Sequence, residues 1–337
     1  MQLVLPPKLV VVAFLALTGV WGVAAPDPLP ANASSAVLWA EDALTKVLRS
    51  ATAGTQAAGT LNLSGARREV LSGQAVFRPQ RSVTMAQARI THLKHRSSNA
   101  VLGSDTIRLQ WVRYIDITRN SDIPRDEQVV HAPGSVPDPY WEEPAIPIQA
   151  DQAQPLWIEV RVPENAPAGD YDGLLTVTAQ GSSFTLPVCV HVWDFALPLK
   201  QRLSVVNWWQ FPGPGFESHG AEDWDLLRRF AVFLVEHRQT DLQTDFSRIR
   251  ESVNAPPGET YDTSRLERYA EVAFDAGIRQ IHLHSVGRRT ADILDPQARV
   301  EPNEANLRRL AAWEKVIQRR GWQRRFVTSI VDEPFVC

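Results

Sequence analysis

The chain has 337 residues, of which 44% are hydrophobic and 22% are charged. This composition is typical of a folded protein, and the length is sufficient for two domains. Its 35 basic and 38 acidic side chains give a formal net charge of -3 and are spread along the sequence, which argues against a nucleic acid as partner.

The N-terminus has the pattern of a targeting segment. Lys8 precedes the apolar run LVVVAFLALTGV at residues 9–20, and small residues follow at positions 22–25. This pattern predicts a signal peptide over residues 1–25, cleaved near Ala24, and a secreted or periplasmic protein. An uncleaved anchor is the alternative. No later stretch is long and apolar enough to span a membrane.

Residues 26–198 are expected to form an antiparallel β-sandwich. Short β-branched or aromatic runs alternate with turns rich in Gly, Pro, Asp and Asn, as is typical of such sandwiches. In the run LWIEVRV at residues 156–162, Leu156 and Ile158 fall on one face and Trp157 and Glu159 on the other, which predicts a half-buried strand. The other runs are REVLSGQAVFRP, TIRLQWVRYIDIT, YDGLLTVTA and SFTLPVCVHVWDF.

Residues 199–337 show a different pattern, in which apolar strand-like runs alternate with helical ones. This alternation predicts parallel strands joined by right-handed crossovers. Helices are expected at about 222–237, at TSRLERYAEVAFDAG with a cap at Thr263 or Ser264, and at about 303–320, closed by Gly321. The expected strands are RLSVVNWW at 202–209, TDLQTDF, IRQIHLH and RRFVTSIVDEP.

Four such units fit either an open doubly wound sheet or a (β/α)₈ barrel. No G-x-G-x-x-G follows the first strand and no phosphate-loop lysine is present, so a nucleotide site is unsupported and the barrel is preferred. The fold class is therefore β followed by α/β, with residues 199–337 as strands one to four of a (β/α)₈ barrel. A complete barrel takes about 250 residues. Only 139 follow Pro198 (337 minus 198), so the chain is expected to be a C-terminally truncated fragment.

Asp332 and Glu333 are the main catalytic candidates. They follow the last strand-like run, and reacting groups in barrels of this kind lie at the carboxyl ends of strands. Pro334 ends the strand, which lets both carboxylates face one ligand. Neighbouring carboxyl groups push their pKa values apart, and glycoside hydrolysis needs one protonated and one ionised acid. A solvated turn or a salt bridge is the alternative reading.

The motifs VDEP, LWIEVRVPENAPAGDYDGLLTVTA and VHVWDFALP resemble glycoside hydrolase family 123 and the related DUF4091 proteins. GARREVLSGQAVFRP, VPDPYWEE and FLVEHRQT extend the resemblance over nearly the whole mature chain. It implies a β-N-acetylgalactosaminidase-like enzyme acting on a glycan or glycoconjugate by a substrate-assisted retaining mechanism. In that mechanism Asp332 would orient the acetamido group of the substrate, and Glu333 would be general acid and then general base. The chain is expected to lack the family's remaining barrel strands and its C-terminal sandwich, and this truncation is expected to impair its activity.

Three further residues are candidates for substrate contact. Trp208 and Trp209 end the first expected barrel strand, where an aromatic face can stack on a sugar, although a place in the core is the stronger alternative. His284 could touch a sugar hydroxyl at a strand end. His282 shares its strand face, but no third ligand has suitable spacing, so no metal or other cofactor is expected. A noncatalytic secreted protein that binds glycans or partners is the alternative function.

Overall fold

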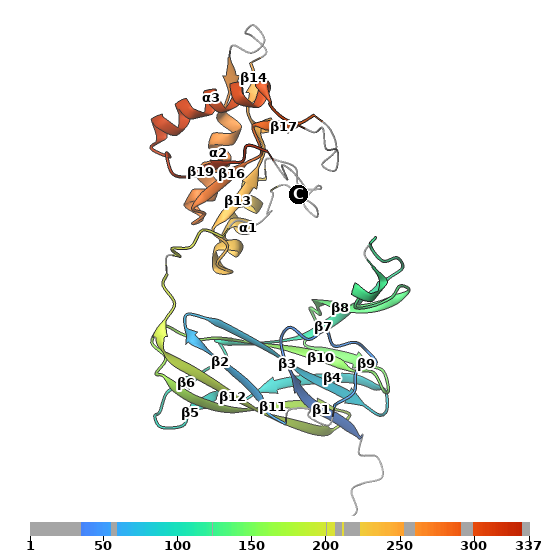
Figure 1. Cartoon of the computed structure of the whole chain (residues 1–337). Coiled ribbons are helices and arrows are strands. Elements are labelled where there is room, and N and C mark those ends of the chain that lie inside the picture. Colours follow the sequence, from blue (N-terminus) through green and yellow to red (C-terminus); the bar gives the residue numbers. More distant parts are fainter. Residues whose placement is uncertain are drawn as a thin grey trace, which may run out of the picture. The chain divides into compact units, whose positions relative to one another are not determined.

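The computed structural model describes residues 35–54, 59–122, 124–199, 201–205, 211, 223–252, 260–290 and 299–331 (Figure 1). The chain divides into two compact units, Met1–Leu197 and Pro198–Cys337. The expected signal peptide at residues 1–25 lies outside the described residues. Among the described helices, none combines the length and the hydropathy that a membrane span requires.

The first unit is a β-sandwich. Its strands are β1 (Ala36–Glu41), β2 (Leu61–Arg67), β3 (Val70–Pro79), β4 (Val83–Ile90), β5 (Leu93–His95), β6 (Val101–Leu102), β7 (Ile107–Ile117), β8 (Gly134–Tyr140), β9 (Ala145–Ile148), β10 (Gln154–Arg161), β11 (Gly169–Ala179) and β12 (Ser182–Ala196), with the short 3₁₀ helix η1 (Arg125–Glu127). One sheet has the order β1-β3-β10-β7-β8, and the other β2-β12-β11-β4-β9, with β5 and β6 attached. The two sheets lie face to face in Figure 1.

Most strand pairs are antiparallel, as the sequence predicts, but β2 pairs with β12 in parallel. The pair β11 and β12 forms a hairpin whose two turn residues, Gln180 and Gly181, have φ of 49° and 79°. Positive φ at both positions matches the right-handed twist of the flanking strands. In β10, Leu156, Ile158 and Val160 are buried, whereas Trp157 and Glu159 are half-buried, which confirms the predicted alternation.

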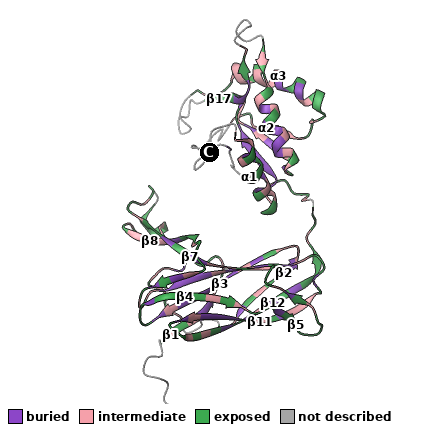
Figure 2. Ribbon diagram, turned by 180° about the vertical axis from the view of Figure 1, so that it is seen from behind, coloured by how far each residue is buried: buried purple, intermediate pink, exposed green. Residues whose placement is uncertain are grey.

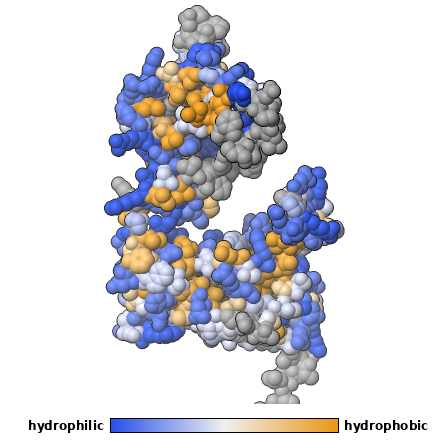
Figure 3. Space-filling model, viewed as in Figure 1, coloured by the Kyte–Doolittle hydropathy of each residue, from blue (hydrophilic) through white to orange (hydrophobic). Residues whose placement is uncertain are grey.

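The core of the sandwich is made by the inward faces of both sheets. Phe77 of β3 lies 5.2 Å from Phe184 of β12, measured between ring centroids, so the two sheets meet through aromatic contact. Trp111 of β7 and Tyr171 of β11 are fully buried in the same cluster. Figure 3 shows hydrophobic and hydrophilic residues interspersed over the surface of this unit.

The second unit contains a parallel sheet with helices. Its elements are α1 (Trp224–Glu236), β13 (Asp241–Thr244), the short 3₁₀ helix η3 (Phe246–Arg248), β14 (Arg250–Glu251), β15 (Tyr261–Asp262), α2 (Ser264–Asp275), β16 (Gln280–Leu283), β17 (Gly287–Arg289), β18 (Val300–Pro302), α3 (Glu304–Arg320) and β19 (Phe326–Thr328). The sheet has the order β13-β16-β19, and both pairs are parallel. Helices α1, α2 and α3 each contribute buried residues to one core with this sheet (Figure 2).

The helix ends follow the predicted signals with one difference. Asn303 caps α3 by accepting a hydrogen bond from the Asn306 N–H at 3.2 Å, and Gly321 ends the helix with φ of 68°. Thr263 occupies the predicted position before α2, but its side chain makes no capping hydrogen bond. The carboxylate of Asp262 accepts from the Ser264 N–H instead, at 2.9 Å.

The expected half barrel is only partly visible. Residues 202–205, the described part of the first expected strand, are not in a strand, and residues 206–209 lie outside the described ranges. The order β13, α2, β16, α3, β19 is the predicted β/α alternation with parallel strands. Three parallel strands with their helices are therefore established, and closure into a barrel stays a prediction.

Candidate active site

The candidate site lies at the carboxyl edge of the parallel sheet. Strands β13, β16 and β19 are parallel and in register, so their carboxyl ends meet at one edge. Asp245, His284 and Ser329 are the first residues beyond the three strands. In parallel sheets with helical crossovers, ligands bind outside this edge.

His284 is fixed at this edge through its backbone. Its N–H donates to the Thr244 carbonyl at 3.0 Å, and its own carbonyl accepts from Thr328 Oγ1 at 3.0 Å. These two bonds tie the end of the middle strand to both neighbours. The structure therefore places His284, a candidate for substrate contact, at the predicted edge, with a half-buried side chain.

The chain that leaves β19 is held against the loop that follows β16. The Val286 N–H donates to the Ser329 carbonyl at 3.1 Å, and the Gly287 N–H donates to the Ile330 carbonyl at 2.6 Å. A Cβ on Gly287 would lie 2.5 Å from that carbonyl oxygen, so the close approach depends on glycine. The described chain ends at Val331, one residue beyond this contact.

The other predicted site residues lie outside the described residues: Asp332, Glu333, Trp208 and Trp209. Asp332 is the residue directly after Val331 in the sequence. The described chain therefore runs along the carboxyl edge of the sheet and ends one residue before the acidic pair Asp332 and Glu333. The geometry of the pair itself stays a prediction.

Arg248 is a buried cation near the same edge that sequence reasoning missed. It is 7% exposed, its Nε donates to Thr244 Oγ1 at 2.6 Å, and its Nη2 donates to the Phe211 carbonyl. Its guanidinium carbon lies 4.4 Å from the centroid of the Tyr269 ring. Nη1 has no hydrogen-bond partner among the described residues. Burial holds the pKa of Arg248 below its ordinary value, and the cation is stabilised by the aromatic face.

No sequence signal separates Arg248 from its exposed neighbour Arg250. Both lie within residues 245–251 after β13, and only the tertiary fold buries one of them against Tyr269. Within the described ranges, no group of three or more His, Cys, Asp or Glu could hold a metal ion.

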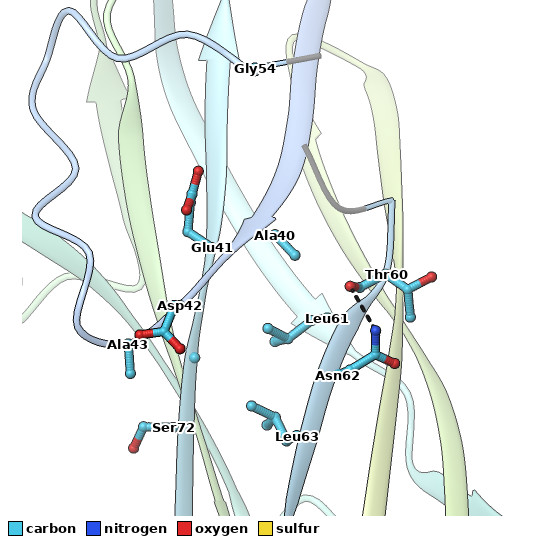
Figure 4. Close-up of a pocket in the computed structure, with 11 residues that line it drawn as sticks. Ala40, Glu41, Asp42, Ala43, Gly54, Thr60, Leu61, Asn62, Leu63 and Ser72 are labelled. Atoms are coloured by element: carbon cyan, nitrogen blue, oxygen red, sulfur yellow. Dashed lines mark hydrogen bonds between the residues drawn. The ribbon is translucent and has the colours of Figure 1, made fainter. Parts of the chain in front are cut away.

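A hollow of about 520 Å³ lies in the sandwich between β1, β2 and β3. Figure 4 shows Glu41 and Asp42 on one side of it, and Thr60 and Asn62 on the other. Both carboxylates have structural partners, because Glu41 accepts from Trp39 Nε1 at 2.9 Å and Asp42 accepts from the Leu44 N–H at 2.7 Å. Among the described residues, both carboxylates that line this hollow therefore take part in local structural hydrogen bonds.

Comparisons with known proteins bear on both units. Residues 44–179 match the family described as Glycoside hydrolase 123 N-terminal domain. Comparison with curated proteins found no match. Among solved structures, the chain is similar to a family 123 glycoside hydrolase from Clostridium perfringens, studied for glycolipid glycan hydrolysis, with 14% identity and a TM-score of 0.65. The match covers 88% of this chain and 58% of that enzyme, so this chain spans less than two thirds of its length.

Two other similarities are too distant to support an argument. The PapD-like domain of human CEP192 has 8% identity and a TM-score of 0.27, over 54% of this chain and 99% of that one. The CsuC–CsuE complex of Acinetobacter baumannii pili has 9% identity and a TM-score of 0.25, over 47% and 57%. The match of residues 44–179 to the glycoside hydrolase 123 N-terminal domain model, and the fold likeness to a family 123 enzyme, agree with the resemblance predicted from the sequence.

Proposed function

We propose that the protein is a glycoside hydrolase that removes terminal β-linked N-acetylgalactosamine-type sugars from a glycan or glycoconjugate. The observation that carries the proposal is the course of the chain after β19. The hydrogen bond from Gly287 to Ile330 holds this segment at the carboxyl edge, two residues before Asp332. The family of residues 44–179 supports the same reaction class.

The proposed mechanism is substrate-assisted and retaining. Glu333, as a carboxylic acid, donates its proton to the glycosidic oxygen while the carbonyl oxygen of the substrate's 2-acetamido group attacks the anomeric carbon. The bond to the leaving group breaks and an oxazolinium ion forms. Glu333, now a carboxylate, then takes a proton from the water that attacks the anomeric carbon. This attack opens the oxazolinium ring and restores the acetamido group.

Asp332 has a different role in this proposal. Its carboxylate accepts a hydrogen bond from the acetamido N–H and stabilises the positive charge that develops there. Two neighbouring carboxyl groups resist simultaneous ionisation, which favours one ionised and one protonated acid near neutral pH. His284 at the edge is proposed to contact a sugar hydroxyl, and Trp208 and Trp209 to stack on the ring.

The test uses the protein as its gene encodes it and p-nitrophenyl β-N-acetylgalactosaminide as substrate. Glu333→Gln is expected to lower kcat by about a hundredfold or more, because the glutamine side chain cannot donate the proton. Asp332→Asn is expected to lose activity that azide restores poorly, because the sugar's own amide is the nucleophile. An unchanged rate in Glu333→Gln would remove this residue from the acid role.

We also propose that the protein is secreted or periplasmic, on the pattern of residues 1–25. N-terminal sequencing of the protein purified from its own cell is expected to give a first residue close to position 25. A protein that retains residues 9–20 would contradict cleavage.

A further inference from the structure

Arg248 is a buried cation that the proposed hydrolysis does not use. It is 7% exposed, and its side chain donates hydrogen bonds to two neutral oxygens, Thr244 Oγ1 and the Phe211 carbonyl. Its Nη1 is buried and has no hydrogen-bond partner among the described residues. A buried guanidinium with neutral partners and an unmet donor costs stability. A gain in stability therefore does not explain an arginine at this position, whereas a role in holding its two partners does.

The two hydrogen bonds of Arg248 connect separate parts of the chain. Thr244 is the last residue of β13, at the carboxyl edge of the sheet, and its Oγ1 lies 2.6 Å from Arg248 Nε. Phe211 lies 37 positions before Arg248, in the segment that follows the first expected strand. The nitrogens of a guanidinium form a rigid planar fork. Arg248 therefore fixes the spacing between the Phe211 carbonyl and the end of β13.

Phe211 is also held from the side of helix α1. Its side chain is 1% exposed, and its ring centroid lies 6.1 Å from that of Phe230 at an interplanar angle of 33°. The side chain of Phe211 is thus attached to α1, and its carbonyl is attached to the end of β13 through Arg248. Trp208 and Trp209 lie three and two positions before Phe211 in the sequence. This anchor therefore limits where both tryptophans can lie.

Arg248 is itself held in place by its neighbours. The carboxylate of Asp245 caps the turn η3 by accepting a hydrogen bond from the Ser247 N–H at 2.7 Å. The guanidinium carbon of Arg248 lies 4.4 Å from the centroid of the Tyr269 ring, and the Tyr269 hydroxyl donates to the Gln243 carbonyl at 3.4 Å. A side chain that is packed on one face and hydrogen bonded at its end presents its donors in a fixed direction.

We propose that Arg248 is a positioning residue for substrate binding: by holding the Phe211 carbonyl, it sets where the segment with Trp208 and Trp209 meets the carboxyl edge. This inference rests on the proposed function, in which both tryptophans stack on the sugar ring. Stacking stabilises the bound substrate and the transition state alike, so it lowers KM and leaves kcat unchanged. Arg248 does not touch the substrate and acts through Phe211.

Arg248→Lys and Thr244→Val test this contact in the protein as its gene encodes it. A lysine ammonium is a point charge and cannot hold both acceptors in a fork. Valine keeps the branched shape of Thr244 and its preference for a strand, but lacks the hydroxyl group. With p-nitrophenyl β-N-acetylgalactosaminide, we expect Arg248→Lys to raise KM about tenfold and Thr244→Val about threefold. In both variants kcat should stay within about twofold of the parent value.

Hydrogen–deuterium exchange gives a readout that does not depend on catalysis. In Arg248→Lys, the peptide with residues 206–211 is expected to exchange about tenfold faster, because the segment loses its attachment to β13. Peptides of the sandwich should exchange as in the parent. Arg250→Gln is the matched control, because Arg250 is exposed in the same stretch after β13. It should change neither the exchange nor KM.

The outcomes separate this inference from the proposed function. A parent protein that does not hydrolyse the substrate contradicts the proposed function, and exchange at residues 206–211 then still decides whether Arg248 positions this segment. Unchanged exchange there in Arg248→Lys overturns the inference. A lower kcat at unchanged KM also overturns it, because that pattern indicates fewer folded molecules rather than a displaced segment. Circular dichroism and a thermal melt check the folding of each variant. If Arg248→Lys does not fold, Thr244→Val carries the same test.

Discussion

Gly277 ends α2 with φ of 105°, a backbone conformation that side chains with a Cβ rarely adopt. A Cβ at this position would also lie 3.3 Å from Cγ1 of Val235 on α1. We expect Gly277→Ala to lower the free energy of unfolding of the second unit by about 2 kcal/mol, from strain and from crowding against α1. Urea unfolding followed by circular dichroism measures this loss.

Gly321→Ala is the matched control for that substitution. Gly321 also has positive φ, 68°, but nothing lies within 4 Å of its added Cβ, and 68° is within the left-handed region. We therefore expect Gly321→Ala to lower the free energy of unfolding by only about 1 kcal/mol, which is the cost of the left-handed conformation for a residue with a Cβ. If the two variants lose equal stability, crowding against Val235 contributes nothing at Gly277.

Asp170 is expected to make the stability of the sandwich depend on pH in the acid range. The hydrogen bond with His191, at 2.7 Å between Oδ1 and Nδ1, lowers the pKa of this carboxyl below its ordinary value, and Arg96 lowers it further. A carboxyl group with a lowered folded-state pKa contributes stability above its unfolded-state pKa, and this stability is lost as pH falls through the folded-state value. The contribution should therefore begin to fall at about pH 4, the ordinary value of the carboxyl group, and disappear only below the lowered folded-state pKa.

We expect Asp170→Asn to lower the Tm of the sandwich at neutral pH and to change it little in strong acid. Thermal melts of the two proteins between neutral and acidic pH measure the difference. Asp194→Asn serves as control, because the Asp194 carboxylate is 86% exposed in its ion pair with Arg67. A constant difference between Asp170→Asn and the parent at all pH values would contradict the role given to this carboxyl.

At the scale of elements, the sequence predicts those strands and helices whose burial repeats regularly. The run at residues 156–162 alternates between core and surface, and β10 has this pattern. The third helix has both an Asn at its start and a Gly at its end, and α3 begins and ends beside them. These signals are local, so they can be recognised before the neighbours of the element are known.

The structural features that the sequence did not predict depend on contacts between segments far apart in the chain. The parallel pairing of β2 with β12 joins residues more than 100 positions apart, and no local pattern states its direction. Tertiary contacts also bury Arg248 against Tyr269. They likewise decide that β7 pairs with β8 only from Val112 onward. For the candidate site, the sequence predicts the strand ends and names His284 there, and the structure adds Arg248 near the same edge.

Gly287, at the start of β17, allows the close approach of the chain segment that leads to the proposed catalytic residues. Its added Cβ would lie 2.5 Å from the Ile330 carbonyl oxygen, so an alanine must push the chain after β19 away. Because Asp332 is two residues beyond Ile330, the displacement should move the acidic pair relative to the substrate. We expect Gly287→Ala to lower kcat for p-nitrophenyl β-N-acetylgalactosaminide by about tenfold to a hundredfold. Gly321→Ala, with open space around its Cβ, should keep its rate, and equal rates in both variants would contradict the positioning role.

At the scale of the whole molecule, the main buried clusters of the two units share no residue. The sandwich cluster contains Trp111 and Leu175, and the cluster of the second unit contains Tyr269 and Trp313. A domain that has its own core can unfold as its own cooperative unit. Differential scanning calorimetry of the chain is therefore expected to show two transitions.

Substitutions in the two cores assign the transitions. Leu175 is fully buried between the sheets, and Leu175→Ala should lower the stability of the sandwich by about 3 kcal/mol through lost burial and a cavity. Trp313 of α3 is fully buried among Trp322 and Phe326, and Trp313→Ala should cost the second unit about 4 kcal/mol. Each variant is expected to shift one transition and leave the other within about 1 °C, since the two buried clusters share no residue. If either variant moves both transitions together, the two units unfold as one cooperative body and the separation of their cores does not govern stability.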